Sequence, residues 1–441
     1  MNRPIFFYQN REIKKVLIVG LGISGFSVFK WFNQYDVIID TYDQKHYEVS
    51  TNAYFDDFNA LELMHYDLIV VAPGIPINKA PFNRLSQYWD KVVGDIELFA
   101  LEVKPLGQKM LAISGSNGKS TTVSLLYHVL RDLDIKVALG GNIGTPALSL
   151  IDPKVQVYVL EISSFQIDLL KKAQFDVGCV LNISPDHLDR YPNYAAYCQS
   201  KLKLFEHSHY KVTNGKQREL ILADKANMSY FNSKDCWIDG KTLFFQGQLF
   251  CTTDELLLQG AHNLENILAV LLVLESLMDL NEAAWAKIKQ SIRHFRGLPH
   301  RCQLVATING VKYINDSKGT NIGAVEAALN GLAQDEKNII IFLGGLAKGA
   351  DFSMLIPALK KSVKKAIIYG QDRLLITKAL EKDIECIIYP HLDEAFATSF
   401  AFAKQGDIVL LSPGCASFDA FSGFVQRGEY FEQLVNQYKV Q

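Results

Sequence analysis

The sequence predicts an α/β protein of three domains, each built on a parallel sheet with covering helices. Three observations predict this class. Short apolar runs alternate with helical patterns along most of the chain. Two glycine-rich turns, at residues 20–25 and 115–121, each follow such a run and open a helix. The length of 441 residues corresponds to about three average domains.

Residues 1–92 are predicted to form a Rossmann-like N-terminal domain. A strand at 15–20 leads through the first glycine turn into a helix at 26–32. Further strands are expected at 36–40 and 67–75. Because strands that alternate with helices pair side by side, a parallel sheet is expected.

Residues 93–296 are predicted to form a central P-loop-type ATPase domain, also with a parallel sheet. Its expected elements are strands at 110–115, 155–164 and 177–184, short strands and turns at 210–260, and a helix at 263–277.

Residues 297–441 are predicted to form a Rossmann-like C-terminal domain. Its expected elements are strands at 311–316, 337–345, 364–370 and 407–414, which alternate with helices such as 324–332 and 392–404.

Composition narrows the class of protein. The net charge of −2 gives no basic field for nucleic acid, and the seven cysteines are dispersed without a CxxC pair, which suits a reduced compartment. The first residues lack a cleavable signal pattern, and no apolar run reaches about 18 residues, the length that a membrane span needs. We expect a cytoplasmic protein, monomeric, without nucleic-acid partners or a membrane span.

The first glycine turn, Gly20 to Gly25, fits the pattern G-x-G-x-x-G after a strand and before a helix. Asp40 lies twenty residues beyond Gly20, where a Rossmann site places its ribose-binding acid. The residues alone leave three interpretations open. The turn could bind no ligand, it could belong to an NAD-dependent oxidoreductase, or it could hold the head group of a nucleotide-diphosphate substrate.

The second glycine turn retains the chemical core of a P-loop. Its backbone amides can cradle phosphates, Lys119 can bridge the terminal phosphates, and the Ser120 hydroxyl can bind Mg²⁺. It departs from the full pattern because Ile113 occupies the first glycine position. A non-enzymatic P-loop switch is the competing interpretation. The predicted phosphate-binding residues are Gly115, Ser116, Asn117, Gly118, Lys119, Ser120 and Thr121.

Three further residues give weaker sequence signals of a functional role. Glu161 ends an apolar strand and is well placed as a magnesium ligand, although it could instead cap the next helix. His187 follows another strand, in a loop where a lone histidine is more often merely exposed. Lys201 looks like an ordinary lysine on a helix surface, and chemistry alone would not select it.

Taken together, the ordered motifs resemble one family, the Mur ligases, which are ATP-dependent amide-forming enzymes of cell-wall precursor synthesis. The motifs are GSNGKST, GNIGTPAL, EISSFQ, NISPDHLDRY, SKLKLFE, GAHNLEN, GLPHR, NDSKGTN, GGLAKGADF and SPGCASFDAF, with RG following. NDSKGTN and GGLAKGADF look like the glutamate-adding member, and the DNPR of diamino-acid-adding members is absent. Another Mur-type or a folylpolyglutamate-type amide ligase is the alternative.

The resemblance implies a peptide synthase that adds D-glutamate to UDP-N-acetylmuramoyl-L-alanine, using ATP through an acyl phosphate and releasing ADP and phosphate. Its first domain would hold the UDP part of the substrate. The implied contacts of the UDP-linked substrate are Gly22, Ile23, Ser24, Asp40, Thr41, Gly74, Asn142 and His187. The ATP site would add Asn263, Asn266, Arg301 and Asp316 to the P-loop.

The resemblance also implies two Mg²⁺ sites, one at Ser120 and Glu161 and one at His187 and Lys201, with Lys201 carbamylated. Lys119, His187 and Lys201 would be the catalytic residues. The implied D-glutamate contacts are Lys318, Thr320, Lys348, Ser417 and Phe424.

Overall fold

The computed structural model describes residues 3–45, 47, 49–187, 190–220, 226–258, 260–333 and 336–439. The chain forms two compact units, which are described separately below. The first comprises residues 1–237, 245–248 and 268–291, and the second comprises 238–244, 249–267 and 292–441.

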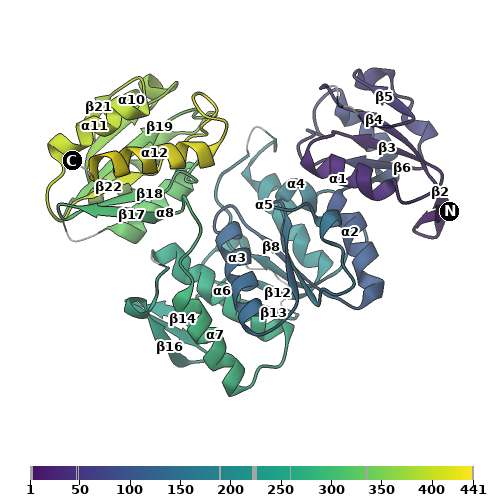
Figure 1. Ribbon diagram of the computed structural model, residues 1–441, viewed down its shortest axis with the longest axis horizontal. Helices are drawn as coiled ribbons and strands as arrows, with labels where there is room; N and C mark the ends of the chain where they lie inside the picture. The colour runs from purple at the N-terminus through teal and green to yellow at the C-terminus, as the bar shows by residue number, and fades with distance from the viewer. Residues whose placement is uncertain are drawn as a thin grey trace. The chain divides into compact units, whose positions relative to one another are not determined.

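The first unit begins with a five-stranded parallel sheet that follows a small β hairpin (Figure 1). The hairpin strands are β1 (Phe6–Tyr8) and β2 (Arg11–Ile13). The sheet has the order β5 (Ala53–Phe55), β4 (Ile38–Tyr42), β3 (Lys15–Val19), β6 (Leu68–Val71) and β7 (Val92–Val93). The strand order reverses at β3, so the carboxyl end of β3 lies at the position where such sheets bind ligands.

The first glycine turn joins β3 to α1 (Ile23–Phe32). Gly20 has a φ of +91°, and a Cβ atom on Gly25 would lie 1.8 Å from the carbonyl oxygen of Gly20. Both positions therefore require glycine, because a side chain would strain or block this tight approach of strand and helix.

The second sheet of this unit has six parallel strands, with the P-loop strand near its centre. Its order is β13 (Met228–Phe231), β12 (Ser208–Asn214), β11 (Phe175–Val180), β8 (Lys109–Ser114), β10 (Val157–Glu161) and β9 (Val137–Gly141). The helices associated with it are α2 (Asp95–Val103), α3 (Lys119–Asp132), α4 (Ser164–Ile167) and α5 (Tyr194–Leu202).

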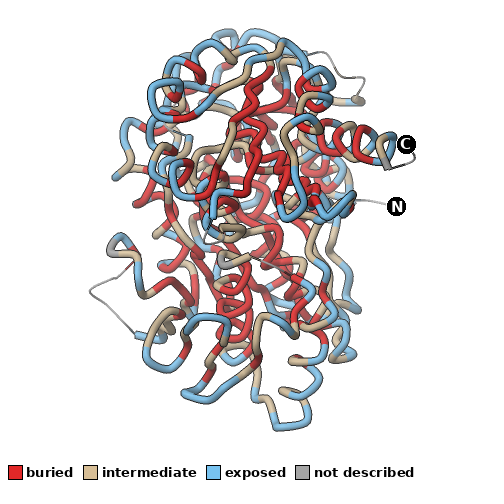
Figure 2. The backbone as a smooth tube through the Cα atoms, turned by 90° about the vertical axis from the view of Figure 1, so that its left-hand side faces the viewer, coloured by how far each residue is buried: buried red, intermediate tan, exposed pale blue. Residues whose placement is uncertain are grey.

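One contiguous apolar core serves both sheets of the first unit. It includes Val16 and Ile18 of β3 together with Met110 of β8 and Leu160 of β10. Phe99 of α2 belongs to the same cluster and is fully buried. In Figure 2, long stretches of the backbone tube are coloured as buried, and exposed stretches lie mostly in the outer loops. The predicted boundary after residue 92 falls inside β7.

The second unit contains a six-stranded sheet with apolar clusters on both faces. Its order is β17 (Gln303–Ile308), β18 (Val311–Asn315), β22 (Ile408–Leu411), β19 (Ile339–Gly344), β20 (Val363–Tyr369) and β21 (Cys386–Ile388). The helices of this region are α8 (Ile322–Leu332), α9 (Ile356–Ser362), α10 (Arg373–Leu380), α11 (Leu392–Phe402) and α12 (Phe424–Lys439). Only the pairing of β17 with β18 is antiparallel in this sheet.

Short strands and two helices complete the chain. They are β14 (Cys236–Asp239), β15 (Thr242–Phe245), β16 (Gln248–Thr252), α6 (Ala261–Leu277) and α7 (Glu282–His294). No helix in the described ranges has both the length and the apolar content to cross a lipid bilayer. The predicted α/β class with parallel sheets is confirmed.

Candidate active site

The second glycine turn lies between β8 and α3, at the carboxyl edge of the central sheet. Gly115 has a φ of +144° and Gly118 a φ of +84°, conformations that only glycine adopts readily. Gly118 is the N-cap of α3, so the unpaired amides of the first helical turn open onto the loop. Such a helix start favours phosphate binding.

Residues that follow β11 brace this turn. The side-chain oxygen of Asn182 accepts from the backbone N of Asn117 at 2.9 Å, and its Nδ2 donates to the Asn117 carbonyl at 3.1 Å. The backbone N of Ser116 donates to the Asn182 carbonyl at 2.8 Å. Since β11 is the neighbour of β8 in the sheet, Asn182 is held against the turn by strand pairing.

The side chain of Lys119 lies across the turn. Its Nζ donates to the carbonyl oxygens of Gly115 at 2.7 Å and Ser116 at 3.0 Å. This places a positive charge beside the amides that would receive phosphate oxygens.

A hydroxyl and a carboxylate meet beside the turn. Ser120 Oγ donates to Glu161 Oε2 at 2.6 Å, and Asn142 Nδ2 donates to Glu161 Oε1 at 2.9 Å. Glu161 ends β10 and Asn142 follows β9, so parallel pairing brings them to the same edge. Ser163, rather than Glu161, caps α4. One carboxylate and one hydroxyl suit Mg²⁺, which usually takes its remaining oxygens from water and phosphates.

Lys201 is buried, so the expectation of an ordinary surface lysine is wrong. Its Nζ donates to the Gly115 carbonyl at 3.0 Å and lies 4.8 Å from the centre of the Tyr197 ring. Burial holds the pKa of Lys201 well below 10.5, and the positive charge of Lys119 lowers it further. The structure therefore favours a neutral amine beside the phosphate turn.

His187 is exposed and adopts a left-handed φ of +54°. Its ring packs edge-on to Phe165 and Tyr197, with ring centres 4.9 Å and 6.1 Å away. The hydroxyl oxygen of Tyr197 also lies 3.0 Å from the hydroxyl oxygen of Ser116. Tyr197 therefore links His187 and Lys201 to the P-loop, a role for which the sequence motifs gave no separate signal.

Oxygen atoms from outside the protein would be needed to complete a metal site. Within the ranges that the structure describes, no three His, Cys, Asp or Glu side chains gather as a metal cluster. Neither of the two predicted pairs, Ser120 with Glu161 or His187 with Lys201, would fill the coordination shell of Mg²⁺ by itself.

The first glycine turn opens at the start of α1. A Cβ atom on Gly22 would meet nothing within 4 Å, and Ile23 is 78% exposed. The backbone N of Leu21 donates to Asp43 Oδ2 at 2.6 Å, so the Asp43 carboxylate contacts this turn.

Asp40 and Thr41, also expected to contact the substrate, are buried within the sheet. Asp40 accepts from Asn52 at 2.8 Å and Tyr66 at 2.9 Å and pairs with Lys15 at 3.0 Å. In this structure the Asp40 carboxylate is therefore engaged by the domain itself.

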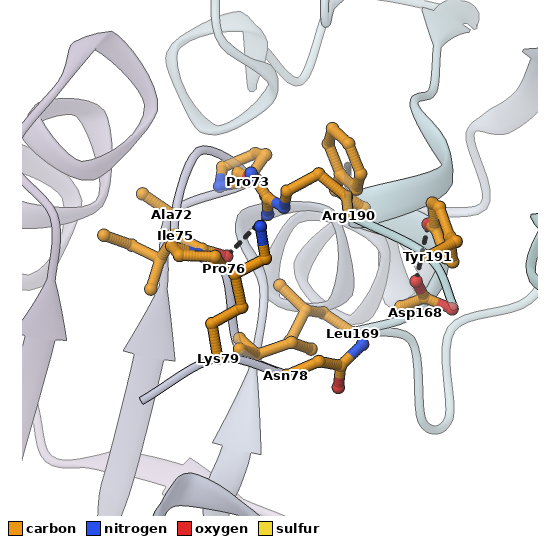
Figure 3. A pocket seen from close by; sticks show the side chains of 12 residues that line it. Ala72, Pro73, Ile75, Pro76, Asn78, Lys79, Asp168, Leu169, Arg190 and Tyr191 are labelled. Carbon is orange, nitrogen blue, oxygen red and sulfur yellow. Dashed lines mark hydrogen bonds between the residues drawn. The ribbon is translucent and has the colours of Figure 1, made fainter. Parts of the chain in front are cut away.

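Gly74 lies in the loop after β6, and a pocket separates part of this loop from the segment after α4 (Figure 3). Residues 72–73 and 75–79 line one side of the pocket. Phe165, Asp168, Leu169, Arg190 and Tyr191 line the other. Arg190 donates to the carbonyl oxygen of Gly74 at 3.0 Å.

The remaining ATP candidates lie in the second unit. Asn263 and Asn266 are buried on α6 and are joined by a 3.2 Å hydrogen bond. Asp316 accepts from the Ser412 hydroxyl at 2.7 Å and the Cys302 backbone N at 3.1 Å. Burial raises the pKa of Asp316 to about 6, partly offset by these hydrogen bonds and by the charge of Arg301.

The amino-acid candidates lie in the second unit, with Phe424 at the start of α12 and the other four outside its helices and strands. Lys318 Nζ lies 4.0 Å from the centre of the Phe424 ring. The loop of Lys348 and the loop of Ser417 run side by side, since Leu346 and Ala416 exchange backbone hydrogen bonds at 2.9 and 3.0 Å. Thr320 is half-buried after β18.

Three family models match the chain. They are the Mur ligase MurD-like N-terminal domain at residues 14–94, the Mur ligase middle domain at 113–274, and the Mur ligase glutamate ligase domain at 300–415.

The chain belongs to the Mur ligase family.

Curated relatives of this Mur ligase cover nearly its whole length. It is 43% identical over 434 residues to UDP-N-acetylmuramoylalanine–D-glutamate ligase of Francisella tularensis subsp. novicida, with 98% of each chain covered. It is 43% identical over 442 residues to the protein of that name from Francisella philomiragia, covering 98% of this chain and 99% of the relative.

Solved structures share the fold of this Mur ligase at low identity. The MurF ligase of Thermotoga maritima in complex with ADP is 16% identical, with a TM-score of 0.63 and 99% of each chain covered. A pseudomurein peptide ligase type C from Methanothermus fervidus is 16% identical, with a TM-score of 0.62, 97% of this chain and all of that chain covered.

Four residues that contact the candidate site residues were not selected from the sequence: Asn182, Asp186, Tyr197 and Arg190. The first two had a usable signal, because Asn182 lies near the end of the strand predicted at 177–184 and Asp186 follows that strand directly. Asp186 Oδ2 lies 3.8 Å from His187 Nε2. The contacts of Tyr197 and Arg190 with the candidate residues could not be predicted from the sequence, because they form only when the fold brings distant segments together.

Proposed function

We propose that this Mur ligase joins D-glutamate to UDP-N-acetylmuramoyl-L-alanine in cytoplasmic peptidoglycan precursor synthesis, and that it converts ATP to ADP and phosphate through an acyl-phosphate intermediate. The observation that carries the proposal is the 43% identity over 98% of the chain to ligases of that name. The arrangement around the second glycine turn supplies the chemistry that such a ligase requires.

ATP would bind with its phosphates at the second glycine turn. The amides at the start of α3 and the Lys119 ammonium would contact phosphate oxygens. Asn263, Asn266, Arg301 and Asp316 are proposed as further ATP contacts. Mg²⁺, bound at Ser120 and Glu161, would neutralise charge on the phosphates.

The acceptor is a carboxylate, which is a poor electrophile. Its oxygen attacks the γ-phosphorus of ATP, the bond to the β-phosphate oxygen breaks, and an acyl phosphate and ADP result. Because two anions approach each other, the protein's contribution is mainly positive charge and orientation, and Lys119 supplies the charge at the turn.

The neutral amine of D-glutamate then attacks the acyl carbon. An amide bond forms, inorganic phosphate leaves, and the amine loses its proton. Lys318, Thr320, Lys348, Ser417 and Phe424 are proposed to hold D-glutamate. Lysines and hydroxyls are suitable partners for its two carboxylates.

Lys201 would become a carbamate. A neutral amine adds to CO₂, forms a C–N bond and releases one proton, and the product carries negative oxygens that an ammonium lacks. The lowered pKa of Lys201 favours this reaction because it leaves the amine uncharged. With His187, the carbamate would bind a second Mg²⁺.

The first glycine turn would hold the UDP group, which takes no part in bond making. Gly22, Ile23, Ser24 and Gly74 offer exposed or half-exposed positions for it. Asn142 and His187 would contact the sugar–peptide part. Asp40 and Thr41 stay proposed contacts, although Asp40 already has three protein partners. The enzyme is proposed to act as a monomer on these small molecules.

Phosphate release tests the proposal directly. Purified protein with ATP and Mg²⁺ should release phosphate only when both UDP-N-acetylmuramoyl-L-alanine and D-glutamate are present. Parallel reactions with L-glutamate, L-alanine and L-lysine should stay at background. Release that does not need D-glutamate would defeat the proposal, and nicotinamide reduction with candidate substrates would instead support the oxidoreductase alternative.

A further inference from the structure

The guanidinium of Arg190 contacts three consecutive peptide groups in the loop after β6. Nη1 donates to the Gly74 carbonyl at 3.0 Å, and Nη2 donates to the carbonyls of Pro73 at 3.4 Å and Ile75 at 2.7 Å. The centre of the guanidinium lies 4.2 Å from the centre of the Phe165 ring. A rigid fork of donors spread over several acceptors restrains orientation more than one bond would.

We propose that Arg190 is a positioning residue for the UDP-linked substrate and acts through the loop at residues 73–75. This inference rests on the proposed function, because it takes Gly74 as a contact of that substrate. Arg190 itself is not proposed to touch the reacting atoms.

Peptide geometry explains how Arg190 acts at a distance. The peptide bond between Pro73 and Gly74 is trans, so its N–H and C=O point in opposite directions. Since the Pro73 carbonyl faces Arg190, the N–H of Gly74 points away from it. A Cβ atom on Gly74 would meet nothing within 4 Å, so the loop is open around this position.

The charge of Arg190 also strengthens that N–H as a donor. A cationic donor on the carbonyl oxygen polarises the shared peptide group, and hydrogen bonds along such a chain reinforce one another. Arg190 thereby both orients and polarises the Gly74 amide.

The backbone of Arg190 connects this loop to the phosphate site. The backbone N of Arg190 and of Tyr191 donate to the His187 carbonyl at 2.9 and 3.1 Å. The Tyr191 hydroxyl donates to Asp168 at 2.8 Å and lies 3.0 Å from that of Ser200, the residue before Lys201. Arg190 thus fixes the loop at residues 73–75 relative to His187 and Lys201, the two residues proposed to bind the second Mg²⁺.

Loss of the guanidinium should loosen the loop without unfolding the unit. The two sheets are already joined by their common buried core. Arg190 lies instead at the wall of the pocket, where it reaches toward the loop of Pro73 and Ile75 (Figure 3).

Steady-state kinetics of Arg190→Ala, Arg190→Lys and Lys79→Ala test the proposal. Lys79 is the matched control, because it is an exposed cation that lines the same pocket from the same loop. In Arg190→Ala, we expect KM for UDP-N-acetylmuramoyl-L-alanine to rise by about tenfold or more, as for the loss of charge-assisted hydrogen bonds. KM for ATP should stay unchanged, Arg190→Lys should be intermediate, and Lys79→Ala should match the natural protein.

Millimolar guanidinium provides a readout that a merely structural defect would not give. It should restore part of the lost affinity of Arg190→Ala for the UDP-linked substrate and have no such effect on Lys79→Ala. If Arg190→Ala does not fold, Arg190→Lys carries the test through its KM. An unchanged KM for the UDP-linked substrate, or an equal rise in KM for ATP, would overturn the role of Arg190. A natural protein that releases phosphate without D-glutamate would instead defeat the proposed function, whatever the variants do.

Discussion

Lys201 Nζ donates a 3.0 Å hydrogen bond to the carbonyl oxygen of Gly115, 86 residues earlier in the chain. The pairing buries an amine at the first glycine of the phosphate turn, next to the positive charge of Lys119. Both burial and that charge disfavour the protonated form. The structure therefore places two lysines at the same turn and disfavours the charged form of Lys201.

Replacement of Lys201 by methionine should change how stability depends on pH. The unfolded chain takes up a proton at this lysine below about pH 10.5, whereas the folded protein does so only below its lowered pKa. Between those values the unfolded state binds more protons, so the free energy of unfolding of the natural protein should rise with pH relative to Lys201→Met. Urea unfolding over a pH series in buffer depleted of CO₂, where the amine stays unmodified, measures this difference, and parallel profiles would contradict it.

The proposed carbamylation of Lys201 predicts that the ligase activity depends on CO₂. Activity should fall in buffer depleted of CO₂ and recover when bicarbonate is added, because the carbamate forms reversibly. Lys201→Met should be inactive under both conditions. Equal rates of the natural protein with and without CO₂ would argue against the modification.

Replacement of Lys119 by alanine should lower kcat by at least about 100-fold, since it removes a cation at the developing charge. Its hydrogen bonds go to backbone carbonyls of the turn, so the fold should persist. Lys154→Ala, an exposed lysine of the same sheet region, is the control. Retained turnover with an unchanged melting temperature would remove Lys119 from its assigned role.

Glu97 should be a major contributor to stability. Its buried carboxylate accepts from the backbone N atoms of Lys171, Lys172 and Ala173 at 2.9, 2.9 and 3.0 Å. Glu97→Gln replaces one acceptor oxygen by a donor and leaves buried N–H groups unpaired, which should cost about 2–4 kcal/mol. Denaturant unfolding measures this loss, with the exposed Glu62→Gln as control; similar stabilities of the two variants would contradict it.

Asp316 should make the free energy of unfolding fall as the pH rises, which is opposite to the effect expected for Lys201. Its pKa rises from 3.8 in the unfolded chain to about 6 in the folded protein. Between these values the folded state binds more protons, so the stability that Asp316 contributes in acid is lost as the pH rises toward 6. The loss is at most about 3 kcal/mol at 1.36 kcal/mol per pKa unit. Asp316→Asn should lack this slope in acid unfolding experiments; an unchanged slope would refute the assignment.

The sequence predicted the features that depend on local pattern. Strand, glycine turn and helix occur at both predicted sites, and Glu161 ends its strand beside the P-loop as expected. Local pattern sufficed because glycine conformations and strand periodicity are properties of neighbouring residues.

Properties that arise from distant contacts could not be read in this way. The α5 segment has too few residues to show which face is buried, so Lys201 looked like a surface residue. The spacing from Gly20 identified Asp40, but the partners that engage it, Tyr66 and Asn52, are supplied by the fold. The antiparallel strand β17 likewise depends on pairing with β18 rather than on its own pattern.

The apolar core common to the first two sheets bears on how the enzyme could be dissected. A fragment that begins at residue 93 would expose the face of α2 around Phe99, which packs in the same cluster as Phe29 and Phe32 of α1. Residues 1–92 are therefore not a detachable module, and gene fragments cut there should aggregate rather than yield a working ATPase. Chimeras that exchange substrate specificity between relatives should transfer residues 1–237 as a block.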